Sequence, residues 1–194
     1  MTAFDLLFIL IVAASAVTWI AAAVSALRRP RARALRILGV WTVCAVFYLA
    51  IVAVVGIASP QRILHPGDPW CFDDWCLIVE QVTHAPAPPQ VAYTVSLRIF
   101  SHARRVSQRA KGAWIYVIDS DGRRYAPEPD SAATPLDVLL QPGESVSTSR
   151  TFKVPPDATD LALITGHGFP YWLHLPIIGD ESGLWHKHAA IRLQ

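Results

Sequence analysis

The chain has 194 residues, of which 53% are apolar, and its net charge is +2. The charges are unevenly spread: from Ser59 onward, 12 basic residues stand against 14 acidic ones. A nucleic-acid-binding domain needs a basic surface of its own, so we expect no nucleic-acid partner for this chain.

Two long apolar runs open the sequence. The first, Leu6 to Leu27, holds only Ser, Thr and Trp as polar interruptions, and the second, Leu35 to Ala58, carries Arg36 at its edge. About 20 apolar residues are enough for a helix to cross the hydrocarbon core of a membrane. The sequence therefore predicts a transmembrane helical hairpin over residues 1–58, with spans at about 6–27 and 35–58, and the lipid bilayer as a partner.

A cleaved signal peptide is the alternative for the first run. Ala23 to Ala26 resembles a cleavage site, because small residues surround the position. However, the run follows Asp5 rather than a basic segment, and it is longer than the apolar region of a signal peptide, about 7–15 residues. A membrane span fits these features better.

A basic cluster separates the two runs. Basic residues near the ends of a span stay on the cytoplasmic side, and after the second run the first basic residue is Arg62 alone. We therefore expect a cytoplasmic loop, extracytoplasmic N- and C-termini, and a place in the cell (inner) membrane. The cluster also has the chemistry to bind anionic lipid headgroups. Its members are Arg28, Arg29, Arg31, Arg33 and Arg36.

Beyond a Pro- and Gly-rich linker at 59–70, the pattern changes to that of β-strands. Apolar and polar residues alternate over Val91–Ile99, and a weaker alternation, interrupted by Thr148 and Arg150, covers Val146–Val154. Such alternation is typical of strands with one buried face. Further strands are predicted at Leu77–Thr83, Ala113–Ile118, Arg123–Tyr125, Leu161–Thr165 and His188–Leu193.

Turn signals divide these strands. They lie at Asp119–Gly122, Gln141–Glu144 and Pro155–Asp157, and a short helical turn is expected within Ser131–Leu140. Short strands separated by turns indicate a β-sandwich or barrel. We predict an all-β sandwich over residues 71–194, outside the cytoplasm. Its expected core includes Trp114, Tyr116, Phe152, Leu161 and Leu163.

Three segments give this region a family resemblance. They read Asp-Ser-Asp-Gly-Arg-Arg-Tyr-Ala-Pro at 119–127, Leu-Leu-Gln-Pro-Gly-Glu-Ser at 139–145 and Thr-Phe-Lys-Val-Pro at 151–155. Residues 76–165 thereby resemble the immunoglobulin-like extracytoplasmic domains of unknown function found in bacterial membrane proteins and lipoproteins. The resemblance implies an immunoglobulin-like sandwich and carries over no functional residue. It does not account for Gly179–His188.

Cys71 and Cys76 enclose four residues just after the second apolar run. Disulfides persist in oxidising compartments outside the cytoplasm. A local disulfide that ties the linker to the first strand is therefore the preferred interpretation. Free thiols and a redox pair remain as alternatives, although the usual redox motif has only two residues between its cysteines.

Four histidines near the C-terminal end suggest a second hypothesis. His186 and His188 would share one face of a strand, and His167 and His174 precede them. Imidazoles brought together in this way would hold copper or zinc. We treat a metal-handling domain as the alternative function.

The sequence holds no motif that predicts an enzyme. The adjacent carboxylates Asp73 and Asp74, like Asp180 and Glu181, would point to opposite faces of a strand. Nucleophile-elbow, P-loop and dinucleotide fingerprints do not occur. We therefore expect no catalysis and no cofactor, but a binding or structural role in the cell envelope, with an envelope protein as a candidate partner.

Overall fold

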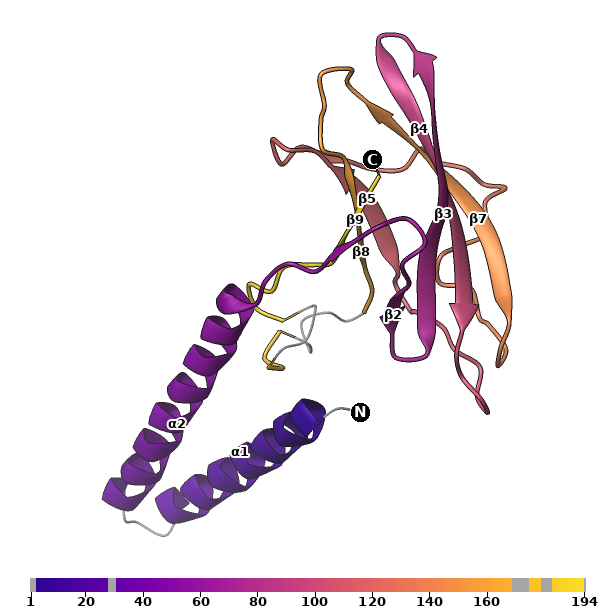
Figure 1. Cartoon of the computed structure of the whole chain (residues 1–194). Coiled ribbons are helices and arrows are strands. Elements are labelled where there is room, and N and C mark those ends of the chain that lie inside the picture. Colours follow the sequence, from indigo (N-terminus) through magenta and orange to yellow (C-terminus); the bar gives the residue numbers. More distant parts are fainter. Residues whose placement is uncertain (1–2, 28–30, 169–174, 179–182, 194) are drawn as a thin grey trace. The chain divides into compact units, whose positions relative to one another are not determined.

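The computed structural model describes residues 3–27, 31–168, 175–178 and 183–193, and these form two compact units. One unit contains the helices α1 (Ala3–Leu27) and α2 (Arg31–Ala58) with the described residues between 175 and 187. The other contains all the strands, from Gln61 to Gly168 and from His188 to Leu193 (Figure 1).

The two helices coincide with the two apolar runs and extend beyond each run at its N-terminal side. α2 begins at Arg31, so that Arg31, Arg33 and Arg36 are helical residues. It ends at Ala58, where the Ser59 amide still donates to the Val55 carbonyl at 2.9 Å. Pro60 follows and cannot donate the next helical hydrogen bond, which explains the end of the helix.

The strands form a β-sandwich of two sheets (Figure 1). One sheet has the order β1-β9-β8-β5-β6 and the other the order β2-β3-β4-β7. All neighbouring strands are antiparallel except β1 and β9. The strands are β1 (Ile63–Leu64), β2 (Trp70–Phe72), β3 (Trp75–Ala87), β4 (Gln90–Ser101), β5 (Trp114–Ile118), β6 (Arg124–Tyr125), β7 (Ser145–Val154), β8 (Ala162–Gly166) and β9 (Ala190–Arg192).

The core lies between the sheets and follows the predicted alternation. Val95, Leu97 and Ile99 of β4 are completely buried, and Phe152 of β7 lies beside Tyr93 on the same face. Each of the seven predicted strands overlaps an observed one. All three predicted turns are confirmed by amide-to-carbonyl hydrogen bonds, from Gly122 to Asp119, Glu144 to Gln141 and Ala158 to Pro155.

Two expectations about this region were wrong. Trp114 and Tyr116 do not belong to the core, because Ile115 and Val117 occupy the buried face of β5. Ser131–Leu140 contains turns rather than a helical turn. The largest buried side chains are instead Trp70 and Trp75, whose rings meet edge to face with centroids 6.1 Å apart.

The predicted linker contributes to the sandwich. Ile63 and Leu64 form β1, which pairs with Ala190 and Ile191 of β9, and Leu64 is buried. A main-chain hydrogen bond from the Ala190 amide to the Arg62 carbonyl extends this contact. The strand unit therefore closes its sheet with residues from both ends of its sequence.

Thr148 and Arg150, which interrupt the apolar pattern of β7, do share the inner face of that strand. They lie opposite Leu97 and Val95 in the register with β4. The Arg150 guanidinium donates to the Thr134 carbonyl at 2.6 Å and to the Thr148 hydroxyl at 2.6 Å. Burial lowers the pKa of Arg150. The loop before β7 and β7 itself thus supply the acceptors that a half-buried arginine needs.

Candidate functional site

The contact between α1 and α2 combines small and hydroxyl-bearing side chains with the rings of Trp19 and Trp41, whose centroids are 5.4 Å apart. On α1 the less exposed positions recur every three or four residues, and they include Ser15, Thr18, Ala22 and Ser25. The Trp41 indole of α2 donates to the Ser15 hydroxyl at 3.1 Å. Small residues and interhelical hydrogen bonds are the usual means of packing helices inside a lipid bilayer.

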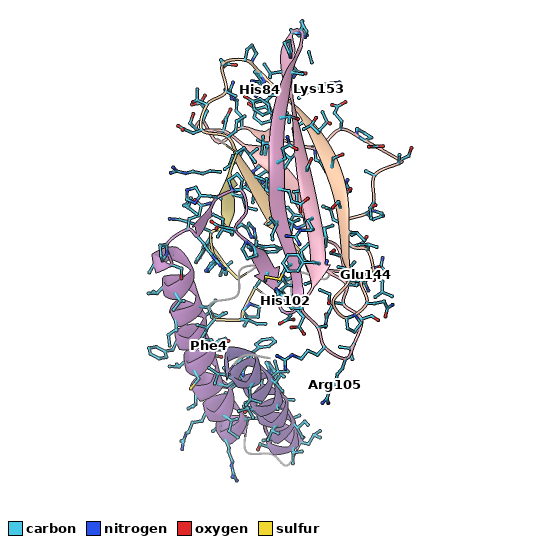
Figure 2. All side chains as sticks on the ribbon, turned by 45° about the vertical axis from the view of Figure 1, so that its right-hand side comes forward. Phe4, His84, His102, Arg105, Glu144 and Lys153 are labelled. Carbon is cyan, nitrogen blue, oxygen red and sulfur yellow. A yellow bond between two sulfur atoms is a disulfide. The ribbon has the colours of Figure 1, made fainter. Side chains whose placement is uncertain are left out.

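The outer surfaces of both helices are apolar. Only 6% of the apolar stretch of α1 and 11% of that of α2 is buried, and side chains project outward all around both helices (Figure 2). A helix of a water-soluble protein turns its large apolar residues inward. Here they point outward instead, as Val17, Ile20, Val43, Phe47 and Val54 do.

The arginines of α2 lie at its N-terminal end, where positive charge does not stabilise a helix. Arg31, Arg33 and Arg36 are exposed in its first turns, and no acidic residue accompanies them. The N-terminus of a helix carries a partial positive charge and favours anions. The stability of the helix therefore does not explain the position of these arginines. Arg28 and Arg29 lie outside the described residues.

A segment close to the C-terminus packs on the second half of α2. The Tyr48 hydroxyl donates to the Pro176 carbonyl at 2.6 Å. Gly56 lies against the Leu184 main chain, where any Cβ atom would clash with the carbonyl oxygen. The Leu184 amide in turn donates a hydrogen bond to the Leu175 carbonyl. The aromatic run Phe169–Trp172 lies outside the described residues.

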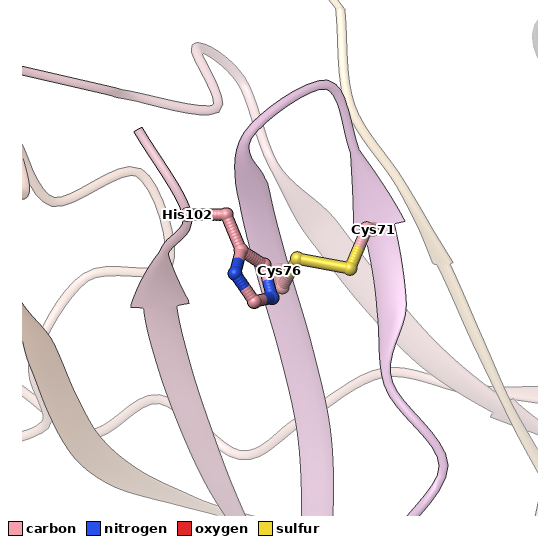
Figure 3. A group of neighbouring side chains, drawn as sticks. All are labelled: Cys71, Cys76 and His102. Atoms are coloured by element: carbon pink, nitrogen blue, oxygen red, sulfur yellow. A yellow bond between two sulfur atoms is a disulfide. The ribbon is translucent and has the colours of Figure 1, made fainter. Parts of the chain in front are cut away.

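The predicted disulfide is present between Cys71 and Cys76. The two cysteines face one another across β2 and β3, on either side of the Asp73–Asp74 turn. His102 stands beside them, because its amide donates to the Asp74 carbonyl at 2.7 Å (Figure 3). The ligand-type atoms of these three residues lie within 4.8 Å of one another.

This cluster has the residue types of a zinc or copper site, but its redox state decides what it can do. A cysteine binds metal as a thiolate, and the disulfide leaves neither sulfur in that form. In the oxidised protein the cluster is therefore a brace between two strands. Only the reduced form would offer two sulfurs and one imidazole, a donor set that zinc accepts.

The four histidines of the alternative metal hypothesis do not form a cluster among the described residues. His174 lies outside those residues. Among the described residues, the one cluster of potential metal ligands is Cys71, Cys76 and His102, which includes none of the four histidines. His167 is buried and stacks on Phe72. His188 meets the Trp114 ring edge to face, with centroids 5.2 Å apart. Both rings are thus used in packing.

An aromatic patch, which we define as Trp114, Tyr116, Arg124 and His188, covers the outer face of the five-stranded sheet. The Trp114 and Tyr116 rings are nearly parallel, with an interplanar angle of 8° and centroids 5.5 Å apart. The Arg124 guanidinium lies 5.0 Å from the Tyr116 ring centroid. The Trp114 indole packs directly on Gly166 of β8, where a Cβ atom would overlap it.

The patch is half-buried rather than hidden, and its composition is that of a contact surface. Tryptophan, tyrosine and arginine dominate the residues that contribute most to protein–protein binding. Gly166 allows the indole to lie flat, and neighbouring rings hold it there. These contacts fix the orientation of the indole. The sequence does not reveal the patch, because β5 is apolar on both faces.

The carboxylates do not form a catalytic pair in the part of the chain that the structure describes. Asp73 and Asp74 are exposed in the turn of the β2–β3 hairpin, and Asp180 and Glu181 lie outside the described residues. Asp119 is the buried carboxylate, and it accepts hydrogen bonds from the Tyr125 hydroxyl at 2.7 Å and the Arg123 Nε at 2.6 Å. Burial raises its pKa, but these hydrogen bonds outweigh burial and lower the pKa to about 2.

The two-sheet architecture places the strand unit among β-sandwich proteins. No protein-family model matches the sequence, and no curated protein matches it. Among solved structures, the chain is similar to an uncharacterised β-sandwich protein from Clostridium difficile 630. That likeness has 10% identity and a TM-score of 0.43, and it covers 70% of this chain and 96% of the other.

Two further structures show the same degree of likeness. MPT63, a secreted protein from Mycobacterium tuberculosis, is 14% identical to this chain, with a TM-score of 0.43. The likeness covers 57% of this chain and 93% of the MPT63 chain. The yjhA protein from Bacillus subtilis is 10% identical to this chain, with a TM-score of 0.43. The likeness covers 68% of this chain and 99% of the yjhA chain.

Proposed function

We propose that this protein is a membrane-anchored module of the bacterial cell envelope. In this proposal α1 and α2 cross the cytoplasmic membrane as a hairpin, and the β-sandwich, of immunoglobulin-like type, lies outside the cytoplasm. Its role is binding or structural support rather than catalysis.

The inverted surface of the helical pair carries this proposal. Most large apolar side chains of both helices are exposed, whereas Ser15, Thr18 and Ala22 occupy less exposed positions of α1. Water would penalise this arrangement at every exposed leucine, isoleucine and phenylalanine. Hydrocarbon favours it, since lipid tails are as apolar as those side chains.

Two independent features support the orientation. The arginines at the start of α2 favour a cytoplasmic position for the loop between the helices. The Cys71–Cys76 disulfide lies in the strand unit, and such bonds persist in an oxidising compartment. Because the remainder of α2 separates the arginines from the cysteines in the sequence, the two signals agree only if α2 crosses the membrane.

The partner that we propose is another protein of the envelope, bound through the aromatic patch. A photo-crosslinking residue at Tyr116 should then give a discrete protein adduct in intact cells. The same residue at Ser147, which is exposed on the other sheet, should give none. Equal labelling from both positions, or no adduct from position 116, would contradict the proposed surface.

Membrane integration can be tested with one pair of substitutions on the full chain. Val17 is 66% exposed near the middle of α1, and Leu27 is 85% exposed at its end. An aspartate at the centre of a span costs about 3 kcal/mol of insertion free energy, whereas a charge at the end of a span reaches water. The wild-type chain and Leu27→Asp should stay in the pellet after alkaline carbonate extraction, while Val17→Asp should lose integrated protein.

The opposite behaviour would contradict the anchor. If the helices were surrounded by water, aspartate at position 17 would be harmless, because the side chain would be solvated there. Release of the wild-type chain by carbonate, together with a silent Val17→Asp, would show that the apolar helices do not cross a bilayer.

A further inference from the structure

An open groove runs along the contact between α1 and α2. Its volume is about 800 Å³, which lies within the range of small-molecule sites. Residues of both helices line it, from Ile11 to Thr18 on α1 and from Arg33 to Tyr48 on α2. The groove belongs to the helical unit alone.

The wall of the groove is apolar in effect, although it contains hydroxyl groups. The Ser15 hydroxyl donates to the Ile11 carbonyl at 2.7 Å and accepts from the Trp41 indole. The Thr18 hydroxyl donates to the Ala14 carbonyl at 2.8 Å. These groups are therefore satisfied within the helices and need no polar ligand. What remains for an occupant is a surface of methyl, methylene and aromatic groups.

Both charges of the groove lie at one end. Arg33 and Arg36 line it and are exposed, whereas Arg31, at the start of the same helix, does not line it. The guanidinium group is the side chain best suited to phosphate, because it donates paired hydrogen bonds in a fixed plane. The N-terminus of α2 adds a partial positive charge at the same end.

The length of the apolar part matches one leaflet. Arg36 and Tyr48 are twelve positions apart in α2, which corresponds to about 18 Å along the helix. The hydrocarbon core of a bilayer is about 30 Å thick, so one leaflet contributes about 15 Å. An acyl chain that starts at the arginines would therefore lie along the groove and end near Tyr48.

We infer that this groove binds one anionic glycerophospholipid, with its phosphate at Arg33 and Arg36 and an acyl chain between the helices. The inference rests on the proposed membrane anchor and deepens it: the arginines hold a lipid of the cytoplasmic leaflet as well as setting the topology. The combination of a leaflet-length apolar groove and two arginines at one end selects a lipid over a helix of another protein.

The headgroup part of the inference is tested by native mass spectrometry of the full chain in detergent micelles. The probes are phosphatidylglycerol and phosphatidylcholine with identical acyl chains. One basic residue near an anionic lipid contributes about fivefold in affinity, so wild type should retain one phosphatidylglycerol with about tenfold preference or more. The double variant Arg33→Gln/Arg36→Gln should lose that preference, while Arg31→Gln, which removes a charge from the same turn, should keep it.

The acyl-chain part has its own matched pair. Ala14 lines the groove and Ala13 does not, although both are exposed residues of α1. Ala14→Leu should fill the groove and lower the retention of both lipids, whereas Ala13→Leu should not. Equal effects within either pair, or no preference in wild type, would overturn the lipid site.

Carbonate extraction of the same variants separates this failure from failure of the anchor. If the chain stays in the membrane but shows no lipid preference, only the proposed lipid site is contradicted. If carbonate releases the chain, the proposed membrane anchor is contradicted. Occupation of the groove by a second copy would appear in the same spectra as a dimer without bound lipid, and would also overturn the inference.

Discussion

At the scale of single residues, Asp119 shows how one carboxylate organises a turn. Its side chain is fully buried at the end of β5, and it accepts the Asp121 and Arg123 amides at 3.0 and 2.9 Å. Arg123 also reaches Asp157, with 3.1 Å between the paired atoms. The β5–β6 turn is thereby tied to the turn after β7. The Asp-Ser-Asp-Gly sequence thus serves structure.

The first prediction follows from the pKa of Asp119. It is about 2 in the folded protein, against an ordinary value of 3.8. The unfolded chain therefore takes up a proton as the pH falls below about 4, while the folded chain does not until about pH 2. The stabilising contribution of this carboxylate is present above that window and is lost as the pH falls through it.

Denaturant unfolding of the full chain in detergent at several pH values measures this effect. The wild-type free energy of unfolding should fall more steeply between pH 4 and pH 2 than that of Asp119→Asn. Asp121→Asn, at an exposed position of the same turn, should keep the wild-type slope. Parallel curves for wild type and Asp119→Asn would disprove the assigned pKa.

At the scale of elements, β4 has two faces that differ in environment. Val95 is completely buried, whereas the neighbouring Ser96 lies on the outer, polar face of its sheet. Val95→Asp would place an unpaired charge in the core and should lower the unfolding free energy by about 4 kcal/mol or more. Ser96→Asp should change it by about 0.5 kcal/mol or less.

The same denaturant titration, followed by tryptophan fluorescence, compares these two variants. Loss of the cooperative transition in Val95→Asp with a retained transition in Ser96→Asp is the expected pattern. Similar midpoints for both variants would show that the inner and outer faces of β4 are wrongly assigned.

The β2–β3 hairpin depends on its disulfide. Closing a loop of this length stabilises the folded state by about 2 kcal/mol through the entropy of the unfolded chain. Cys71→Ala/Cys76→Ala should be less stable by about that amount, and Cys44→Ala should not change, because Cys44 is a free cysteine of α2. Mass spectrometry without reductant should find wild-type Cys71 and Cys76 linked. Full alkylation of both thiols in the native protein would rule the bond out.

Much of this element pattern could be predicted because it is local. Alternation over Val91–Ile99 identifies both β4 and its buried face, and the Gly-containing turns mark the strand ends. β5 is different: its five residues are all apolar, so the sequence cannot show which face is buried. The sequence therefore predicts Trp114 and Tyr116 in the core, although they lie on the outer face of β5.

Other features depend on contacts between distant residues. β1 is only two residues long and exists because it pairs with β9, more than 120 positions later. His102 lies beside the disulfide only because β4 runs antiparallel to β3 and returns it to the β2–β3 turn. Neither relation has a local signal, since both are consequences of register.

At the scale of the whole molecule, the two units differ in the side chains that they expose. The sandwich buries its large apolar residues between sheets and exposes serines, threonines and charges. The helical pair instead exposes most of its leucine, isoleucine and valine side chains. This contrast is the basis of the proposed anchor, because exposed apolar side chains favour lipid and exposed polar side chains favour water.

A pair of reporter fusions tests this account most directly. A reporter that is active only outside the cytoplasm is fused after Gln194 in one case and inserted between Arg28 and Arg33 in the other. The account predicts activity from the first fusion and silence from the second, because the arginines keep the loop cytoplasmic while α2 carries the sandwich across. The reverse pair of results, or equal activity at both positions, would contradict it.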